Sequence, residues 1–170
     1  MKAIKFFAVA ILFSGVSVMA SAQVTAKATA SSTIVTPIGI TKTVDMNFGN
    51  VAINSTTAGT VVLAPTGTRT PNGGVTLPAT AGTVAAAEFN VTGAYNYTFS
   101  ITLPSTSHEI KSGSNTMSVT DFTSTPTPTG TLSATGSATV KVGATLNVSA
   151  GQAAGTYTSV TPFEVTVNYN

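Results

Sequence analysis

The chain has 170 residues, no cysteine, no tryptophan and a formal net charge of +2 at pH 7. Its surplus positive charge resides in Lys2 and Lys5, because the other basic and acidic residues balance. A neutral chain with scattered Lys and Arg lacks the clustered basic surface of a nucleic-acid-binding protein. The lack of cysteine excludes a disulfide-stapled scaffold.

Residues 1–22 have the pattern of a removed secretory signal peptide. Lys2 and Lys5 precede the apolar run 6–20, and Ala20-Ser21-Ala22 has the small-x-small form of a cleavage site. A retained membrane anchor is the alternative, but the run of about 15 apolar residues is shorter than the roughly 20 that cross a membrane. We therefore expect export through the periplasm to the cell surface or the medium, with no membrane insertion after cleavage.

The composition predicts an all-β fold. Thr and Val are abundant, Gly and Pro recur throughout the chain, and no long segment after the signal has a helical apolar repeat. Short alternating segments separated by turn residues favour a single immunoglobulin-like β-sandwich of roughly eight to ten antiparallel strands. We assign this domain to residues 33–170.

The first alternation of the mature chain runs from Val24 to Ile40, which is longer than an ordinary strand. We expect it to divide into an N-terminal extension, residues 23–32, and a core strand, residues 34–40, interrupted or placed at an edge by Pro37. The extension is either a frayed tail or a donor-like arm that pairs with another sheet. Its alternating side chains are Val24, Ala26, Ala28 and Ala30.

A second alternation, from Tyr95 through Phe99 to Leu103, predicts a central strand. Tyr95 and Tyr97 share the parity of Phe99, so we expect their rings on the core face. The alternative is a platform on which sugar rings stack. A third alternation runs from Leu132 to Val148, with Thr135-Gly136-Ser137 as a turn within it, and predicts strand structure on either side of this turn.

The clearest alternation lies at the C-terminal end. Glu164, Thr166 and Asn168 separate four apolar residues, so one face of this strand should contact a core and the other should contact water. We expect this core strand to border a groove that a partner strand fills. Its inward residues are Phe163, Val165, Val167 and Tyr169.

Residues suited to catalysis or metal binding are scarce. The only histidine, His108, lies beside Glu109 in a polar segment and is predicted to be a solvated loop residue. One histidine and five scattered acidic residues form no recognisable ligand set or catalytic motif. We predict a non-enzymatic protein with no catalytic residues, no cofactor and no metal site.

Three segments resemble a secreted bacterial family catalogued as domain of unknown function 4402. They are Asp45-Met-Asn-Phe48-Gly49, Val142-Gly-Ala-Thr-Leu146 and the end of the chain from Ala154-Gly-Thr-Tyr157 to Val165-Thr-Val-Asn-Tyr169-Asn170. The resemblance implies a secreted β-sandwich and assigns no activity. The closing Gly-x-Tyr and alternating strand are more distantly similar to chaperone–usher pilins and spore-coat-type secreted pilins, in which a neighbour's N-terminal extension fills a groove beside the C-terminal strand.

These patterns predict a structural or adhesive cell-surface subunit, fimbria-like and assembled by β-strand addition. Its expected partners are further copies of itself, a periplasmic chaperone and an outer-membrane assembly protein. We expect no binding to nucleic acid. The alternative is a monomeric secreted module that binds carbohydrate or another surface.

Overall fold

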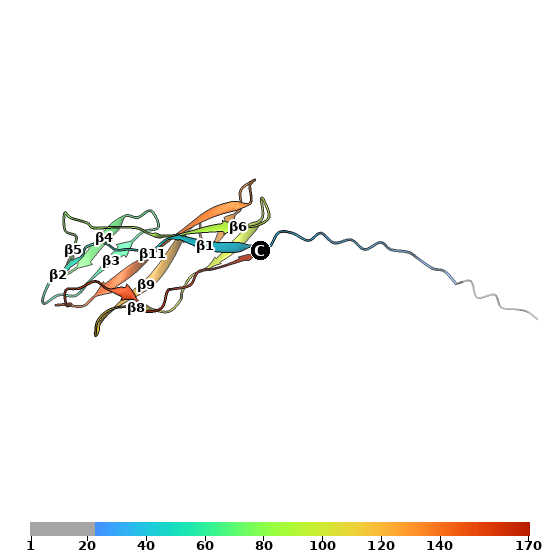
Figure 1. The fold of residues 1–170 in the computed structure, drawn as a ribbon. Helices are drawn as coiled ribbons and strands as arrows, with labels where there is room; N and C mark the ends of the chain where they lie inside the picture. Colours follow the sequence, from blue (N-terminus) through green and yellow to red (C-terminus); the bar gives the residue numbers. More distant parts are fainter. Residues whose placement is uncertain (1–22) are drawn as a thin grey trace, which may run out of the picture. The chain divides into compact units, whose positions relative to one another are not determined.

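The computed structural model describes residues 23–170, and the predicted signal peptide lies outside this range. The described chain belongs to two compact units that divide between Thr33 and Ile34. In the first unit, residues 23–33 have no regular secondary structure and every side chain is exposed. The second unit, Ile34–Asn170, contains all the strands (Figure 1).

The structure forms thirteen strands and no helix between residues 23 and 170. The strands are β1 (Gly39–Val44), β2 (Ala52–Ile53), β3 (Gly59–Leu63), β4 (Arg69–Gly73), β5 (Val75–Thr76), β6 (Ala87–Thr92), β7 (Thr98–Thr102), β8 (His108–Ser112), β9 (Asn115–Thr125), β10 (Thr129–Thr131), β11 (Ser137–Val148), β12 (Thr158–Ser159) and β13 (Thr166–Tyr169). Accordingly, this part of the chain has no helix that is long and apolar enough to cross a membrane.

All strand pairs are antiparallel, and they form three sheets. The largest sheet has the order β1-β6-β11-β9-β8-β12, with β3 joined to β11 and β4 joined to β3. A three-stranded sheet has the order β10-β7-β13, and β2 pairs with β5. The sequence therefore predicts the central position of β7 in its sheet correctly.

Strand β11 organises the large sheet, where it lies between β3 and β9 in Figure 1. Its first half, to Val142, pairs with β6, and its second half, from Ala144, pairs with β3. Its other edge pairs with β9. Inward side chains occur at every second position of this strand, as the sequence predicts. Those of its first half belong to one hydrophobic cluster and those of its second half to another, so the strand connects the two clusters.

The first cluster lies between the large sheet and the three-stranded sheet. Phe99 of β7 is fully buried, and it belongs to this cluster with Phe89 of β6, Val140 of β11 and Val167 of β13. The second cluster joins β3, β9 and the end of β11, and includes Val61, Val119 and Leu146. Packing of antiparallel sheets across a shared core confirms the predicted β-sandwich.

The N-terminal core strand begins later than the sequence predicts. Ile34 is 96% exposed, and β1 starts only at Gly39. Pro37 has no main-chain N–H and restricts the residue before it, so regular pairing starts beyond it. Ile38 and Ile40 do pack against the first cluster. The prediction of a core strand over residues 34–40 is therefore wrong in its first half.

The alternation that begins at Tyr95 also differs from its prediction. Strand β7 starts at Thr98, while Asn96 has a positive φ of 63° in the turn before it. This turn breaks the parity, so Tyr95 is 68% exposed and Tyr97 is 46% exposed. The prediction that both rings face the core with Phe99 is wrong.

Candidate functional site

The C-terminal strand alternates between core and solvent in the structure. Val167 is 7% exposed and belongs to the first cluster, while Phe163, Val165 and Tyr169 are partly buried against that cluster. The residues between them, Glu164, Thr166 and Asn168, are exposed. Regular pairing covers only Thr166–Tyr169, but the alternation of burial continues back to Phe163.

Strand β13 has one paired edge and one open edge. It pairs only with β7, with Asn168 opposite Ser100, and the N–H of Asn170 donates to the carbonyl of Thr98 at 3.3 Å. Antiparallel ladders alternate the direction of their main-chain groups, so the groups of Val167 and Tyr169 point away from β7. Within residues 34–170, β1 contacts β13 without pairing with it. The open edge can therefore accept hydrogen bonds from a further strand.

The hydroxyl of Tyr169 fixes this end of the strand. It donates a hydrogen bond to the carbonyl of Thr36 at 2.7 Å and accepts one from the N–H of Ala94 at 2.6 Å. Its ring lies edge-to-face against Tyr97, with centroids 5.6 Å apart. A Cβ atom at Gly93 would collide with the hydroxyl, so the absence of a side chain there makes room for it. Tyr169 thus joins the C-terminal strand to the segment before β1 and the turn before β7.

Replacing Tyr169 with Phe should destabilise the domain by about 1–3 kcal/mol, because the buried N–H of Ala94 loses its acceptor. Urea unfolding followed by circular dichroism measures this change. Tyr95→Phe is the matched control, since that ring is 68% exposed, and its effect should stay within about 0.5 kcal/mol. Equal midpoints for both variants would contradict the anchoring role of the Tyr169 hydroxyl.

The predicted arm, residues 23–32, is exposed and has no regular secondary structure. Val24 is 92% exposed, and Ala26, Ala28 and Ala30 are also exposed. Its ten residues would extend over about 33 Å as a strand at about 3.3 Å per residue. The arm and the C-terminal strand belong to different units, and their pairing remains a prediction.

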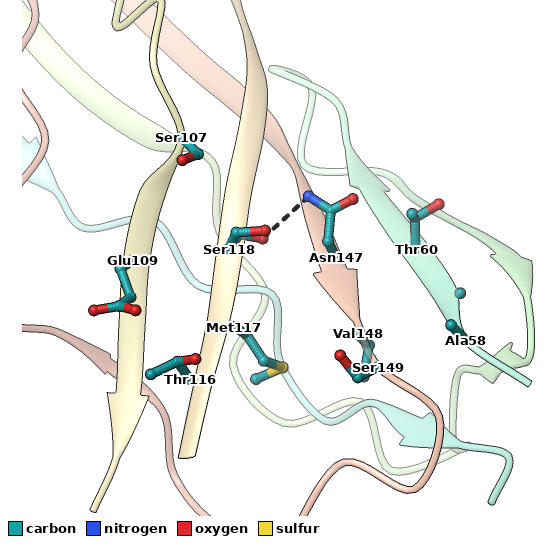
Figure 2. A pocket seen from close by; sticks show the side chains of 11 residues that line it. Ala58, Thr60, Ser107, Glu109, Thr116, Met117, Ser118, Asn147, Val148 and Ser149 are labelled. Carbon is teal, nitrogen blue, oxygen red and sulfur yellow. Dashed lines mark hydrogen bonds between the residues drawn. The ribbon is translucent and has the colours of Figure 1, made fainter. Parts of the chain in front are cut away.

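A second candidate site is a shallow depression of about 580 Å³ on the large sheet. One row of its lining crosses four strands: Thr60 of β3, Asn147 of β11, Ser118 of β9 and Glu109 of β8 occupy successive paired positions. Figure 2 shows these polar side chains along the depression. The amide of Asn147 donates to the carbonyl of Ser118 at 3.2 Å and to Oγ1 of Thr120 at 3.0 Å, which fixes its orientation.

The chemistry of this depression suits a neutral, hydroxyl-rich ligand. Most of its lining side chains carry hydroxyl, amide or carboxylate groups, Met117 and Val148 are the larger apolar side chains, and the lining contains no aromatic ring. This site could not be predicted from the sequence because its residues lie on four separate strands, and only the order β3-β11-β9-β8 brings them together. The available signal was limited to Thr60, Ser118 and Asn147, which alternate with apolar residues, because Glu109 belongs to a segment expected to be a loop.

His108 is placed differently from its prediction. It is half-buried at the start of β8, its Nε2 lies 2.9 Å from Oγ of Ser159 in β12, and its ring packs edge-to-face on Phe163. The prediction of a solvated loop histidine is wrong. Ser159 and His108 resemble two members of a hydrolytic triad, but no carboxylate among residues 23–170 hydrogen-bonds to the other ring nitrogen. The contact ties β8 to β12.

The described acidic residues are dispersed. Glu88, Glu109 and Asp45 form ion pairs with Lys141, Lys111 and Lys42, respectively. Within residues 23–170, no three His, Cys, Asp or Glu side chains lie close enough together to hold a metal ion. The open edge of β13 and the polar depression are two candidate interaction surfaces.

The second unit is thus an antiparallel β-sandwich with an open C-terminal strand edge. A family model described as Domain of unknown function (DUF4402) matches residues 38–169, so the chain belongs to this family. The family resemblance inferred from the sequence motifs is confirmed. No curated protein and no solved structure matches the chain.

Proposed function

We propose that this protein is a secreted, non-catalytic structural or adhesive subunit of a fimbria-like cell-surface assembly. In this proposal, residues 23–32 of one copy add as a strand to the sandwich of another copy. The observation that carries it is the alternation of Val24, Ala26, Ala28 and Ala30 in an exposed arm without secondary structure. Main-chain hydrogen bonds would supply affinity, and the alternating side chains would supply specificity.

Several properties of the chain support strand addition. The arm is continuous with a domain that has its own core, so it can act in assembly without contributing to that core. An edge such as that of β13 presents unpaired main-chain groups, which are a template for another chain. The same exposure favours protection before assembly. We therefore include a periplasmic chaperone and an outer-membrane assembly protein among the proposed partners, with export to the cell surface.

Deleting residues 23–32 should abolish assembly and leave the domain folded, because every deleted side chain is exposed. Size exclusion with light scattering and electron microscopy compare the full chain with the deletion variant at high concentration. Identical monomers in both preparations would contradict the proposal.

A matched pair of substitutions tests the strand character of the arm. Ala28→Asp and Thr29→Asp introduce the same charge at adjacent positions, but on opposite faces of an added strand. Burial of an unpaired carboxylate is strongly unfavourable, so Ala28→Asp should weaken association at least about tenfold, while Thr29→Asp should change it by less than about threefold. A flexible tail would respond equally to both changes.

A second candidate function is a monomeric module that binds carbohydrate or another polar surface. The polar depression favours it, because the row from Thr60 to Glu109 offers several hydrogen-bonding groups to a hydroxyl-rich ligand. A glycan array separates the two functions, since a dedicated lectin binds defined glycans and a structural subunit does not require a glycan. Thr60→Val should then remove binding without changing self-association.

A further inference from the structure

The open edges of the sheets differ in their suitability for a new strand. Strand β1 carries Lys42 and an irregularity in register between Lys42 and Val44, and β4 contains Pro71. Strands β2, β5, β10 and β12 have only two or three residues each. Charged residues, prolines, bulges and short length are the usual features that prevent pairing at a sheet edge. Strand β13 has no lysine, proline, glycine or register shift. It is therefore the edge best suited to accept a partner.

The charges beside this edge complement those of the arm. Lys27 is the only charged residue among residues 23–33. Glu164 is the only charged residue among residues 163–170, it is exposed, and it forms no ion pair within residues 34–170. Both residues lie at the polar parity of their alternations, so both side chains would lie on the solvent face of an added strand.

We infer that the arm of a second copy adds to the open edge of β13 with its Lys27 opposite Glu164. This inference rests on the proposed function and specifies its acceptor edge and register. A cross-strand pair of opposite charges stabilises a sheet, whereas like charges directly opposite one another destabilise it. The ion pair would therefore select one register from those that the uniform alanines of the arm allow.

This register also matches the apolar faces. With Lys27 opposite Glu164, the neighbouring Ala26 and Ala28 lie beside Phe163 and Val165, whichever direction the added strand takes. Alanine beside phenylalanine pairs a small side chain with a large one. A shift by one residue would place Lys27 on the core face, where an unpaired ammonium group is strongly disfavoured. A third apolar residue of the arm, Ala30 in a parallel or Val24 in an antiparallel addition, lies beside Val167 in this register.

The test reverses each charge in the full chain and measures self-association by sedimentation velocity over a concentration series. Lys27→Glu and Glu164→Lys each create like charges at the contact and should weaken association about three- to tenfold. Glu164→Gln, which removes the charge and keeps a similar shape, should have a smaller effect. The double variant restores opposite charges and should associate within about twofold of the unmodified chain, as should an equal mixture of the two single variants.

Two controls make the outcome specific. Lys111→Glu and Glu109→Lys produce the same net charges at a pair in β8, and a mixture of these variants tests for general attraction between oppositely charged chains. High salt should reduce the difference between matched and mismatched pairs, because the contact is exposed. Circular dichroism verifies that each variant retains its fold.

The possible failures are distinguishable. If deletion of residues 23–32 abolishes association but the charge reversals change nothing, the Lys27–Glu164 register is wrong and strand addition stands. If the deletion leaves association unchanged, both the proposed function and this register are overturned. If the β8 control mixture is rescued as strongly as the Lys27→Glu and Glu164→Lys mixture, the specific contact is also rejected.

Discussion

Ending the chain after Pro162 should unfold the sandwich. The truncation removes β13, which leaves β7 without one neighbour and exposes the first cluster beside Phe99. It also removes the Tyr169 hydroxyl, the acceptor for the buried N–H of Ala94. The loss thus combines apolar packing, sheet pairing and a hydrogen bond that joins three segments.

The apolar contribution alone is comparable to the stability of a domain. Full burial of a large apolar side chain contributes about 1.5–3 kcal/mol. Val167 is almost fully buried and the other three inward residues are half-buried, so together they contribute about 4–8 kcal/mol. Globular domains have total stabilities of about 5–15 kcal/mol. The truncated chain is therefore expected to lose its native state.

Near-UV circular dichroism and urea unfolding check this expectation. The truncated chain should lose its aromatic dichroism and show no cooperative transition. Deletion of residues 23–32 is the control, because it removes a similar number of residues that are all exposed, and it should leave the transition midpoint unchanged. A cooperatively folded truncation product would show that the C-terminal strand is dispensable for the core.

The fold class was predictable because alternation is a local property. In β11, residues 138–148 keep one parity, and in the C-terminal strand residues 163–169 do the same, so each segment carries its own evidence for a half-buried strand. Sheet order was not predictable in the same way. The pairing of β11 with β3, β6 and β9 depends on contacts between residues far apart in the chain.

Two errors show where parity is insufficient. Tyr95 and Tyr97 have the parity of Phe99, but a turn with a positive φ at Asn96 lies between the two tyrosines, and β7 begins only after Tyr97. Ile34 has the parity of Ile40, but Pro37 separates the two residues. In both cases a residue with special main-chain properties interrupts an apolar pattern, and the pattern alone contains no information about the interruption.

The candidate sites also differ in whether a continuous segment of the sequence reveals them. The arm and the C-terminal strand could be identified from the sequence because each is a continuous segment with a visible alternation. The polar depression could not, because Thr60 and Asn147 become neighbours only through the pairing of β3 with β11. The open edge of β13 also required the structure, since an edge is defined by the absence of a neighbour within the folded domain.

Gly143 lies at the point where β11 exchanges one partner strand for another. Pairing with β6 ends at Val142 and pairing with β3 begins at Ala144, while the register with β9 shifts between Gly143 and Thr145. A Cβ atom at this position would collide with the carbonyl oxygen of Leu63 and lie 2.7 Å from the carbonyl carbon of Ala64. Both contacts are with main-chain atoms, so a rotamer change cannot relieve them.

Gly143→Ala should therefore destabilise the domain by about 3 kcal/mol, which is at the upper end of the usual cost of overpacking. The cost is high because the end of β3 must move, and this movement disturbs the fully buried Leu63. At about 2–4 °C per kcal/mol, this corresponds to a decrease in Tm of about 6–12 °C in a thermal scan followed by circular dichroism. Gly39→Ala is the matched control, since its Cβ would meet only Oγ1 of Thr92 at an ordinary 3.4 Å, and its Tm should change by no more than about 2 °C. Similar Tm values for the two variants would mean that β3 can yield at Gly143, and that the junction between the two clusters is looser than the main-chain contact indicates.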